Sequence, residues 1–294
     1  MSAVLAASNK GKAVKTRIIV AAVGIVILLA AIFLLPIWAM GVVMGAIAGC
    51  AAFELYGATV PESRVKSLKS PFFRIRCYVT AAGALIPFLS SVSNPWISAL
   101  CVAFFVYTLS FGEVMLSFRG GEPIHFSAAT SALFAGAVMP FMQASVVRLG
   151  LNENGWAFII MVFVATFCCD SGAYFAGMFL GKHKLAPHLS PNKTIEGSIG
   201  GLLSGVVFLI AYGLILLACG FKVNFLVIAI YGFLVSVACE LGDLCFSAIK
   251  RIAGVKDYGN ILPGHGGAMD RFDSMTWTAP LMELLTIWVC AISK

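Results

Sequence analysis

The sequence predicts an all-α fold, a polytopic bundle of about nine membrane-spanning helices with the amino terminus in the cytoplasm and the carboxyl terminus outside. Hydrophobic residues make up 60% of the 294 residues and charged residues only 11%. The mean hydropathy is +0.97. A soluble domain does not carry so little charge, and long apolar runs recur along the whole chain, so a membrane protein is indicated.

Each predicted helix corresponds to an apolar run that is long enough to cross the hydrocarbon core, which takes about 20 residues. Neighbouring runs are separated by short polar or proline-containing segments, and Pro36 divides the first two. The nine runs are 18–36, 37–57, 77–92, 95–117, 127–147, 156–180, 199–219, 224–248 and 275–293.

The basic residues give the orientation. With the amino terminus inside, 17 lysines and arginines fall in cytoplasmic segments, whereas only Arg148, Lys222 and Lys294 fall outside. Cytoplasmic loops of membrane proteins carry this excess. The net charge of +7 therefore reports orientation, and no nucleic-acid partner is expected.

The chain is interpreted as one integral membrane domain, 17–294, preceded by a flexible cytoplasmic tail, 1–16. The basic residues of the tail and the apolar run behind them are similar to a signal peptide, but the apolar stretch continues to Phe53, which favours a first membrane hairpin. Within the domain, 17–150 supplies the N-terminal helices and 151–294 the catalytic part. The nine cysteines lie mostly in apolar runs, as buried hydrophobic residues do.

Polar residues inside the predicted spans indicate a functional cavity, because they are costly in hydrocarbon. Asp170 lies in the sixth run. In the eighth run a stripe of polar residues recurs at helical spacing and continues past its end: Glu240, Asp243, Ser247, Lys250 and Arg251. A network that only holds helices together is the alternative, but five groups leading into a charged, glycine-rich segment favour a cavity.

That charged segment, 247–273, has the side chains needed to bind an anion and its metal counter-ion. Asp270 and Asp273 stand three residues apart and can share a metal on one helix face, although capping of the next helix is also open to them. Lys256 and Arg271 can meet phosphate, and glycines flank His265 with a backbone that can approach an anion.

The loop 181–197 is the second polar element. Ser190, Lys193 and Thr194 can supply hydroxyls and an ammonium to phosphates at the start of the seventh run, where the helix dipole adds positive charge. The alternative is that Ser190-Pro191 starts the helix and Glu196 completes a cap. Small residues at helical spacing in the sixth and seventh runs predict close helix contact and are compatible with a homodimer.

These motifs resemble the phosphatidate cytidylyltransferase (CDP-diacylglycerol synthase) family. Upstream matches are Gly242-Asp243 and the blocks around Asp170 and around Ser190; Asn192 stands where many members carry a basic residue. The longest match runs as Ser247-x-x-Lys250-Arg251-x4-Lys256-Asp257 and Pro263-Gly-His265-Gly-Gly267-x-x-Asp270-Arg271-x-Asp273.

The resemblance implies that CTP and phosphatidate react with Mg²⁺ to give CDP-diacylglycerol and pyrophosphate, and the several carboxylates leave room for a second, monovalent cation. It implies metal binding by Asp243, Asp270 and Asp273, with Asp170 as a further acid at the substrate. Nucleotide contacts would come from Ser190, Lys193, Thr194 and Glu196. Lipid phosphate or pyrophosphate would meet Lys250, Arg251, Lys256 and Arg271, and His265 would orient a phosphate.

Two other functions are compatible with the residues. A CTP-dependent polyprenol kinase would transfer the γ-phosphoryl group, and a secondary transporter would place charges near the membrane midplane. The charges here gather on the predicted cytoplasmic side. We therefore expect a multi-pass enzyme of a bacterial inner membrane, with its active site facing the cytoplasm.

Overall fold

The structure, a computed structural model, describes residues 29–60, 70–118, 124–261 and 266–293. It confirms the all-α bundle. Among the described residues, seven helical segments are long and apolar enough to cross a membrane. They are α2 (Ile37–Thr59), α4 (Pro71–Val92), α5 (Pro95–Ser117), the broken helix Phe126–Gly150, α9 (Gly155–Leu180), α10 (Ile195–Ala218) and α11 (Phe225–Ile252).

The first and last predicted spans differ from the other seven. Most of the run 18–36 lies outside the described residues. In its described part, residues 29–34 are helical. The last run is wrong in length, because α13 (Met275–Trp288) has only 14 residues. At 1.5 Å per residue it measures about 21 Å, less than the ~30 Å hydrocarbon core. The chain then forms β4 (Ile292–Ser293), which pairs with β3 (Lys222–Val223). The count of nine spans and the orientation stay predictions.

The helix Phe126–Gly150 is built from four pieces, α6 (Phe126–Leu133), η1 (Phe134–Val138), α7 (Met139–Gln143) and α8 (Ser145–Gly150). The middle piece, η1, is a π-helix in which the Met139 N–H donates to the carbonyl of Phe134. Pro140 follows at once and has no N–H to continue the α-helical ladder. The local sequence therefore explains why the helix changes its winding at this point.

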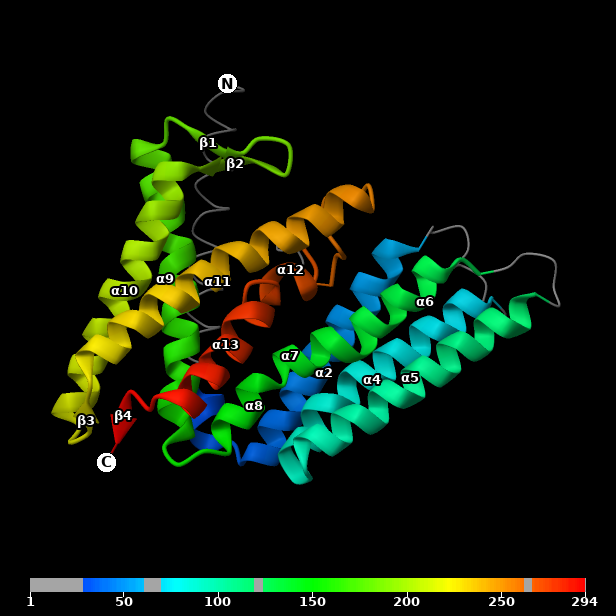
Figure 1. Ribbon diagram of the computed structural model, residues 1–294, viewed down its shortest axis with the longest axis horizontal. Coiled ribbons are helices and arrows are strands. Elements are labelled where there is room, and N and C mark those ends of the chain that lie inside the picture. The colour runs from blue at the N-terminus through cyan, green and yellow to red at the C-terminus, as the bar shows by residue number, and fades with distance from the viewer. Residues whose placement is uncertain (1–28, 61–69, 119–123, 262–265, 294) are drawn as a thin grey trace, which may run out of the picture.

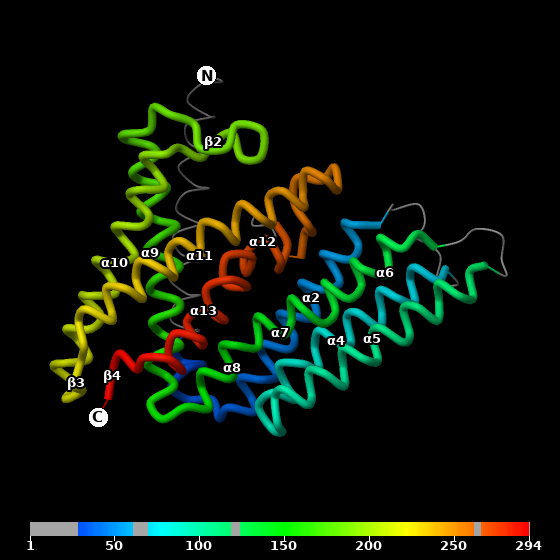
Figure 2. Tube along the Cα trace, viewed as in Figure 1, coloured from blue at the N-terminus to red at the C-terminus, as the bar shows by residue number. Residues whose placement is uncertain are grey.

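The helices form two groups with α11 between them (Figures 1 and 2). On one side lie α2, α4, α5 and the broken helix. On the other side α9 and α10 run antiparallel, joined at one end of the molecule by a hairpin of β1 (Lys184–Ala186) and β2 (Ser190–Thr194). Between the groups α11 crosses obliquely, followed by the one-turn helix α12 (Met269–Phe272) and by α13.

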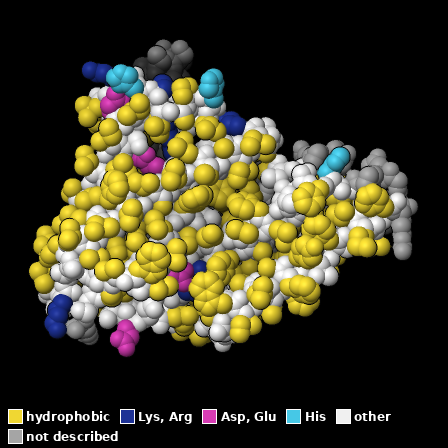
Figure 3. Space-filling view, viewed as in Figure 1, with side chains coloured by type: hydrophobic (Ala, Val, Ile, Leu, Met, Phe, Trp, Pro, Cys, Tyr) yellow, Lys and Arg dark blue, Asp and Glu magenta, His cyan; other side chains and the backbone are white. Residues whose placement is uncertain are grey.

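Apolar side chains cover most of the face seen in Figure 3, and charged side chains gather mainly toward its two ends. Large hydrophobic residues such as Phe104 and Leu203 are more than 60% exposed, which suits contact with lipid and not with water. Inside the bundle Arg148 of α8 pairs with Glu283 of α13 at 2.7 Å. The chain is therefore an integral membrane protein.

The glycine ridges serve contacts within the chain. A side chain at Gly197 would come within 2.9 Å of the Ala173 carbonyl, and one at Gly201 within 3.0 Å of the Ala173 Cβ. Gly205 faces Ser236 of α11 instead. The predicted close contact of the sixth and seventh runs is confirmed, and these ridges give no separate support to a homodimer.

Candidate active site

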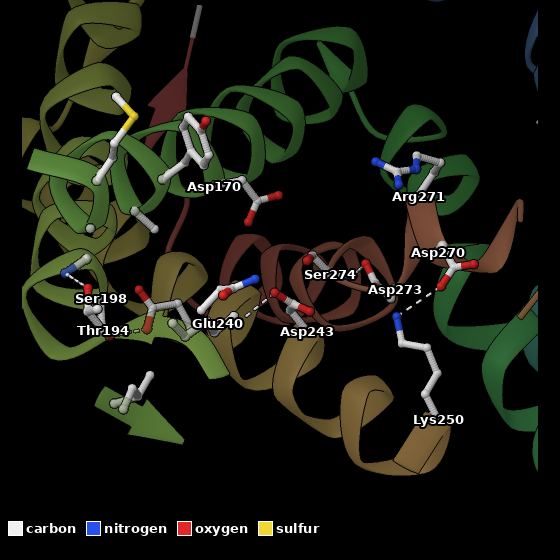
Figure 4. A pocket seen from close by; sticks show the side chains of 18 of the residues that line it. Asp170, Thr194, Ser198, Glu240, Asp243, Lys250, Asp270, Arg271, Asp273 and Ser274 are labelled. Atoms are coloured by element: carbon white, nitrogen blue, oxygen red, sulfur yellow. Dashed lines mark hydrogen bonds and ion pairs between the residues drawn. The ribbon is translucent and has the colours of Figure 1, made fainter. Parts of the chain in front are cut away.

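A cavity of about 570 Å³ opens where α9, α10, α11 and α12 meet the β1–β2 hairpin (Figure 4). It is the meeting point of the two polar elements that the sequence singled out. Eight of the predicted site residues line it: Asp170, Lys193, Thr194, Asp243, Lys250, Asp270, Arg271 and Asp273. Tyr174, Asn192, Ser198, Glu240, Asp257 and Ser274 line it as well, although the sequence argument gave them no contact with substrate.

The polar stripe of α11 forms one wall of the cavity. The carboxylate of Asp243 accepts a hydrogen bond from the Ser247 hydroxyl at 3.3 Å and pairs with the ammonium of Lys193 at 2.6 Å. One turn earlier, Glu240 accepts a hydrogen bond from Ser198 of α10, while its Oε1 is buried without a hydrogen-bond partner among the described atoms. The stripe thus ties α11 to α10 and to the hairpin.

Asp270 and Asp273 have different surroundings, although they stand three residues apart. Both oxygens of Asp270 are engaged: Oδ1 pairs with Lys250 Nζ at 2.9 Å, and Oδ2 accepts the backbone N–H groups of Tyr258 and Gly267. Asp270 therefore organises the loop in front of α12. Asp273, within the part of the chain that the structure describes, accepts only the N–H of Ser274, at 2.8 Å.

Negative charge accumulates around Asp273. Burial, and next the neighbouring carboxylate of Asp243, raise the pKa of Asp273 to about 7, with a smaller contribution from Asp170. Figure 4 shows these three carboxylates around one opening, each from a different element. Close carboxylates that lack enough cations favour the binding of a further positive charge.

The carboxylates suit a hard divalent cation, which prefers oxygen ligands. Among the described residues no three of the His, Cys, Asp and Glu side chains already stand close enough to hold a metal ion. Asp243 and Asp273 fit a cation best, because Asp243 pairs with one lysine and Asp273 pairs with no cation among the described residues, whereas both oxygens of Asp270 are in use. Metal binding by Asp270 stays a prediction.

The N-terminus of α10 is built differently from the predicted cap. The helix begins at Ile195, because Ser190 to Thr194 form β2, and the Thr194 hydroxyl accepts the N–H of Gly197 at 3.1 Å. Starting the helix at Ser190-Pro191 was therefore wrong. Glu196 faces the start of the hairpin, where it accepts the backbone N–H groups of Lys182 and His183.

Three of the predicted basic residues are not seen at the cavity: two do not line it, and one lies outside the described residues. The Arg251 side chain donates to the carbonyl of Leu189 at 3.1 Å, which ties the end of α11 to the hairpin. Lys256 is exposed and, like Ser190, does not line the cavity. His265 lies outside the described residues. The cationic groups that line the cavity are Lys193, Lys250 and Arg271.

Glu54 contacts the catalytic segment, although no sequence motif indicated it. This carboxylate of α2 is only 3% exposed, and its Oε2 accepts the backbone N–H of Met269, the first residue of α12, at 2.9 Å. Gly267 packs against it so closely that a Cβ there would lie 2.4 Å from Glu54 Oε2. The N-terminal helices thus hold the start of α12, the helix that carries Asp270 and has Asp273 as its C-cap.

The comparisons with known proteins agree with the resemblance of the motifs. A model of the "Cytidylyltransferase family" matches residues 15–288. A protein named phosphatidate cytidylyltransferase from Staphylococcus aureus (strain COL) is 35% identical over 222 residues, which cover 74% of this chain and 81% of that protein. One of the same name from Staphylococcus saprophyticus is 34% identical over 224 residues, 74% of this chain and 82% of that protein.

Replacing Glu54 should impair turnover through the loop. Glu54→Leu removes the acceptor of the Met269 N–H, and a hydrogen bond to a charged group contributes about 1.5–3 kcal/mol. We expect kcat to fall about 10- to 100-fold, with Glu54→Gln, which keeps one acceptor oxygen, falling less. The measurement is the steady-state rate of purified, folded variants.

Glu113→Gln is the matched control, because Glu113 is a buried carboxylate of the same half that pairs with Arg74 of α4 and not with the loop. It should retain wild-type turnover. Equal rates for Glu54→Leu and Glu113→Gln would contradict the role given to Glu54.

Proposed function

The chain belongs to the cytidylyltransferase family, and we propose that the acidic cavity described above is where it transfers the cytidylyl group of CTP to phosphatidate. The enzyme is a nucleotidyltransferase of phospholipid biosynthesis whose products are CDP-diacylglycerol and pyrophosphate. The observation that carries the location is the cavity itself, in which carboxylates and basic side chains face each other inside an otherwise apolar bundle.

The reaction needs charge neutralisation and positioning more than proton transfer. A phosphate oxygen of phosphatidate forms a bond to the α-phosphorus of CTP, while the bond from that phosphorus to the bridging oxygen breaks and pyrophosphate leaves. Phosphatidate is already an anion, so no general base is required. Several phosphate groups then share one small volume, and basic side chains fixed around them stabilise the transition state.

Lys193 and Lys250 are suited to this task because each is held by one carboxylate at the cavity wall. Lys193 pairs with Asp243 at 2.6 Å and Lys250 with Asp270 at 2.9 Å, so both ammonium groups are positioned before substrate enters. Arg271 lines the same cavity. In the proposal, Lys193 and Thr194 meet the nucleotide phosphates at the start of α10, and Lys250 and Arg271 meet the lipid phosphate or the leaving pyrophosphate.

Mg²⁺ is proposed as the metal, held by Asp243 and Asp273 with Asp170 nearby. When bound, it would neutralise phosphate oxygens and assist departure of pyrophosphate. The donor set supports this choice, because all three groups are carboxylates and hard cations prefer oxygen. The carboxylates of this chain would orient the cation, and the lysines would balance the charge that remains.

The cytoplasmic face of a bacterial inner membrane is the proposed location of the cavity. The hairpin and the end of α11 lie at the same end of the molecule, and both carry basic residues, such as Lys184 and Lys250, that favour the inside. CTP is a cytoplasmic metabolite, so this orientation also brings the nucleotide to its site. A homodimer stays part of the proposal, without support from the glycine ridges.

The fate of labelled phosphate tests the reaction. With CTP labelled at the α-phosphate, phosphatidate and Mg²⁺, label should move into extracted lipid and pyrophosphate should appear in equal amount. A polyprenol kinase would instead yield CDP as the stoichiometric product. A transporter would move substrate into sealed vesicles without any product, and either result would contradict the proposal.

The metal assignment predicts the effect of removing one carboxylate at a time. Asp243→Asn and Asp273→Asn should each lower kcat about 10²- to 10³-fold, which corresponds to about 3–4 kcal/mol of lost transition-state stabilisation. Rates measured over a series of Mg²⁺ concentrations should also show a weaker dependence on the metal.

Glu153→Gln is the control for that series, because Glu153 is an exposed acid in the turn before α9 and does not line the cavity. Its rate should equal that of the wild type. Near-normal rates with an unchanged Mg²⁺ dependence in both aspartate variants would contradict the assignment of the metal to Asp243 and Asp273.

Thiol labelling tests the sidedness. In a background without native cysteines, His188→Cys in the hairpin and Asn152→Cys before α9 are both exposed positions. An impermeant thiol reagent should modify Asn152→Cys in intact cells, and His188→Cys only after the membrane is opened. The opposite pattern would place the cavity outside, out of reach of CTP.

A further inference from the structure

A second, apolar cavity of about 270 Å³ shares α11 as a wall with the catalytic one. It is formed by the continuous segment η1–α7, by α11 and by α13. Its lining is hydrophobic except for Thr276 and Cys245. Figure 3 shows hydrophobic side chains over this part of the molecular face. Contact with bulk lipid is the alternative to a specific ligand for such a groove. The position and the shape of the groove distinguish the two.

The position links the groove to the catalytic cavity. On α11 the groove residues Phe246 and Ile249 alternate with Asp243 and Lys250, which line the catalytic cavity. At helical spacing these two sets lie on adjacent faces of the same helix. On the other wall, Thr276 follows Asp273 by one turn. A molecule that spans both cavities would place its polar end among the lysines and its apolar end in the groove.

The shape of the groove depends on the π-helical segment. Phe134 and Val138 lie at the two ends of η1, line the groove and are 37% and 44% exposed. A single π-helical turn inside an α-helix frequently marks a functional site. Here its cause is Pro140, and its effect is to line the groove with residues that continue to Met142 on α7.

The lining offers few polar groups to a polar ligand, because besides one hydroxyl its side chains carry only the thiol of Cys245 and the indole N–H of Trp277. The one hydroxyl, that of Thr276, donates to the carbonyl of Phe272 at 2.9 Å and accepts from the amide of Gln143 at 3.2 Å. A nucleoside would lose hydrogen bonds to water on entering and regain few of them. A hydrocarbon chain would lose nothing and would remain in apolar surroundings.

We propose that this groove binds an acyl chain of phosphatidate and so aligns the lipid phosphate with the catalytic cavity. The proposal rests on the proposed function, because the lipid substrate comes from it. It adds a subsite for the lipid tail, formed by η1, α7, α11 and α13, and a route by which the lipid reaches the lysines from the side of the bundle.

Filling the groove tests the proposal. Val138→Trp and Leu281→Trp should raise KM for dioleoyl phosphatidate about tenfold or more, because each buried methylene adds to affinity. KM for CTP should not change, and turnover of dihexanoyl phosphatidate, whose chains are too short to need the groove, should persist. Leu203→Trp and Val207→Trp on the outward face of α10, 61% and 60% exposed, are the matched controls.

Crosslinking of the unaltered enzyme keeps the test independent of how the tryptophan variants fold. Phosphatidate with a diazirine at the end of one acyl chain should label peptides of α7 and α13, and excess dioleoyl phosphatidate should prevent this. Labelling spread evenly over outward faces, α10 included, would overturn the proposal, as would equal kinetics of groove and control variants.

Two further outcomes separate this proposal from others. An unaltered enzyme that forms no CDP-diacylglycerol would contradict the proposed function itself. Groove variants that dissociate a dimer and lose short-chain and long-chain turnover equally would show that a second copy of the chain covers the groove, which would also overturn the acyl-chain assignment.

Discussion

The ion pair between Lys250 and Asp270 is the interaction on which the rest of the site depends. Both groups are largely buried, with side chains 15% and 4% exposed. A buried charge is costly without its partner, so the loop before α12 has to stay where Lys250 can reach Asp270. The same carboxylate also accepts two backbone N–H groups of that loop. This arrangement fixes the start of α12 and, through it, the position of Asp273.

The two halves of the bundle have different tasks around that pair. The second half supplies the groups that face the cavity, from α9, the hairpin, α10 and α11. The first half supplies Glu54, which holds the other side of the same loop, and an apolar cluster in which Tyr56 packs with Met269 and Tyr258. The apolar helices of the first half therefore hold the catalytic loop in position, although they contribute no described residue to the cavity lining.

Much of this could be predicted from the sequence, because charge is so costly in a membrane that each polar group is informative. Helical spacing alone predicts that Asp243 and Lys250 lie on one face of their helix. Because the basic residues place this face and the hairpin on the same side of the membrane, their contact is predicted as well. Contacts between distant segments could not be predicted. Glu54 and Met269 are 215 positions apart, and Arg251 and Glu196 turned out to hold the hairpin by backbone contacts that no motif records.

A double-mutant cycle on Lys250 and Asp270 tests most directly whether this pair holds the site together. Lys250→Met, Asp270→Asn and the double variant would be compared by their free energies of unfolding in detergent and by kcat. If the pair holds the loop, each single change costs about 3–5 kcal/mol, and the double variant is more stable than the sum of the single losses by at least about 1 kcal/mol, although its kcat remains low. Strictly additive losses would contradict the account.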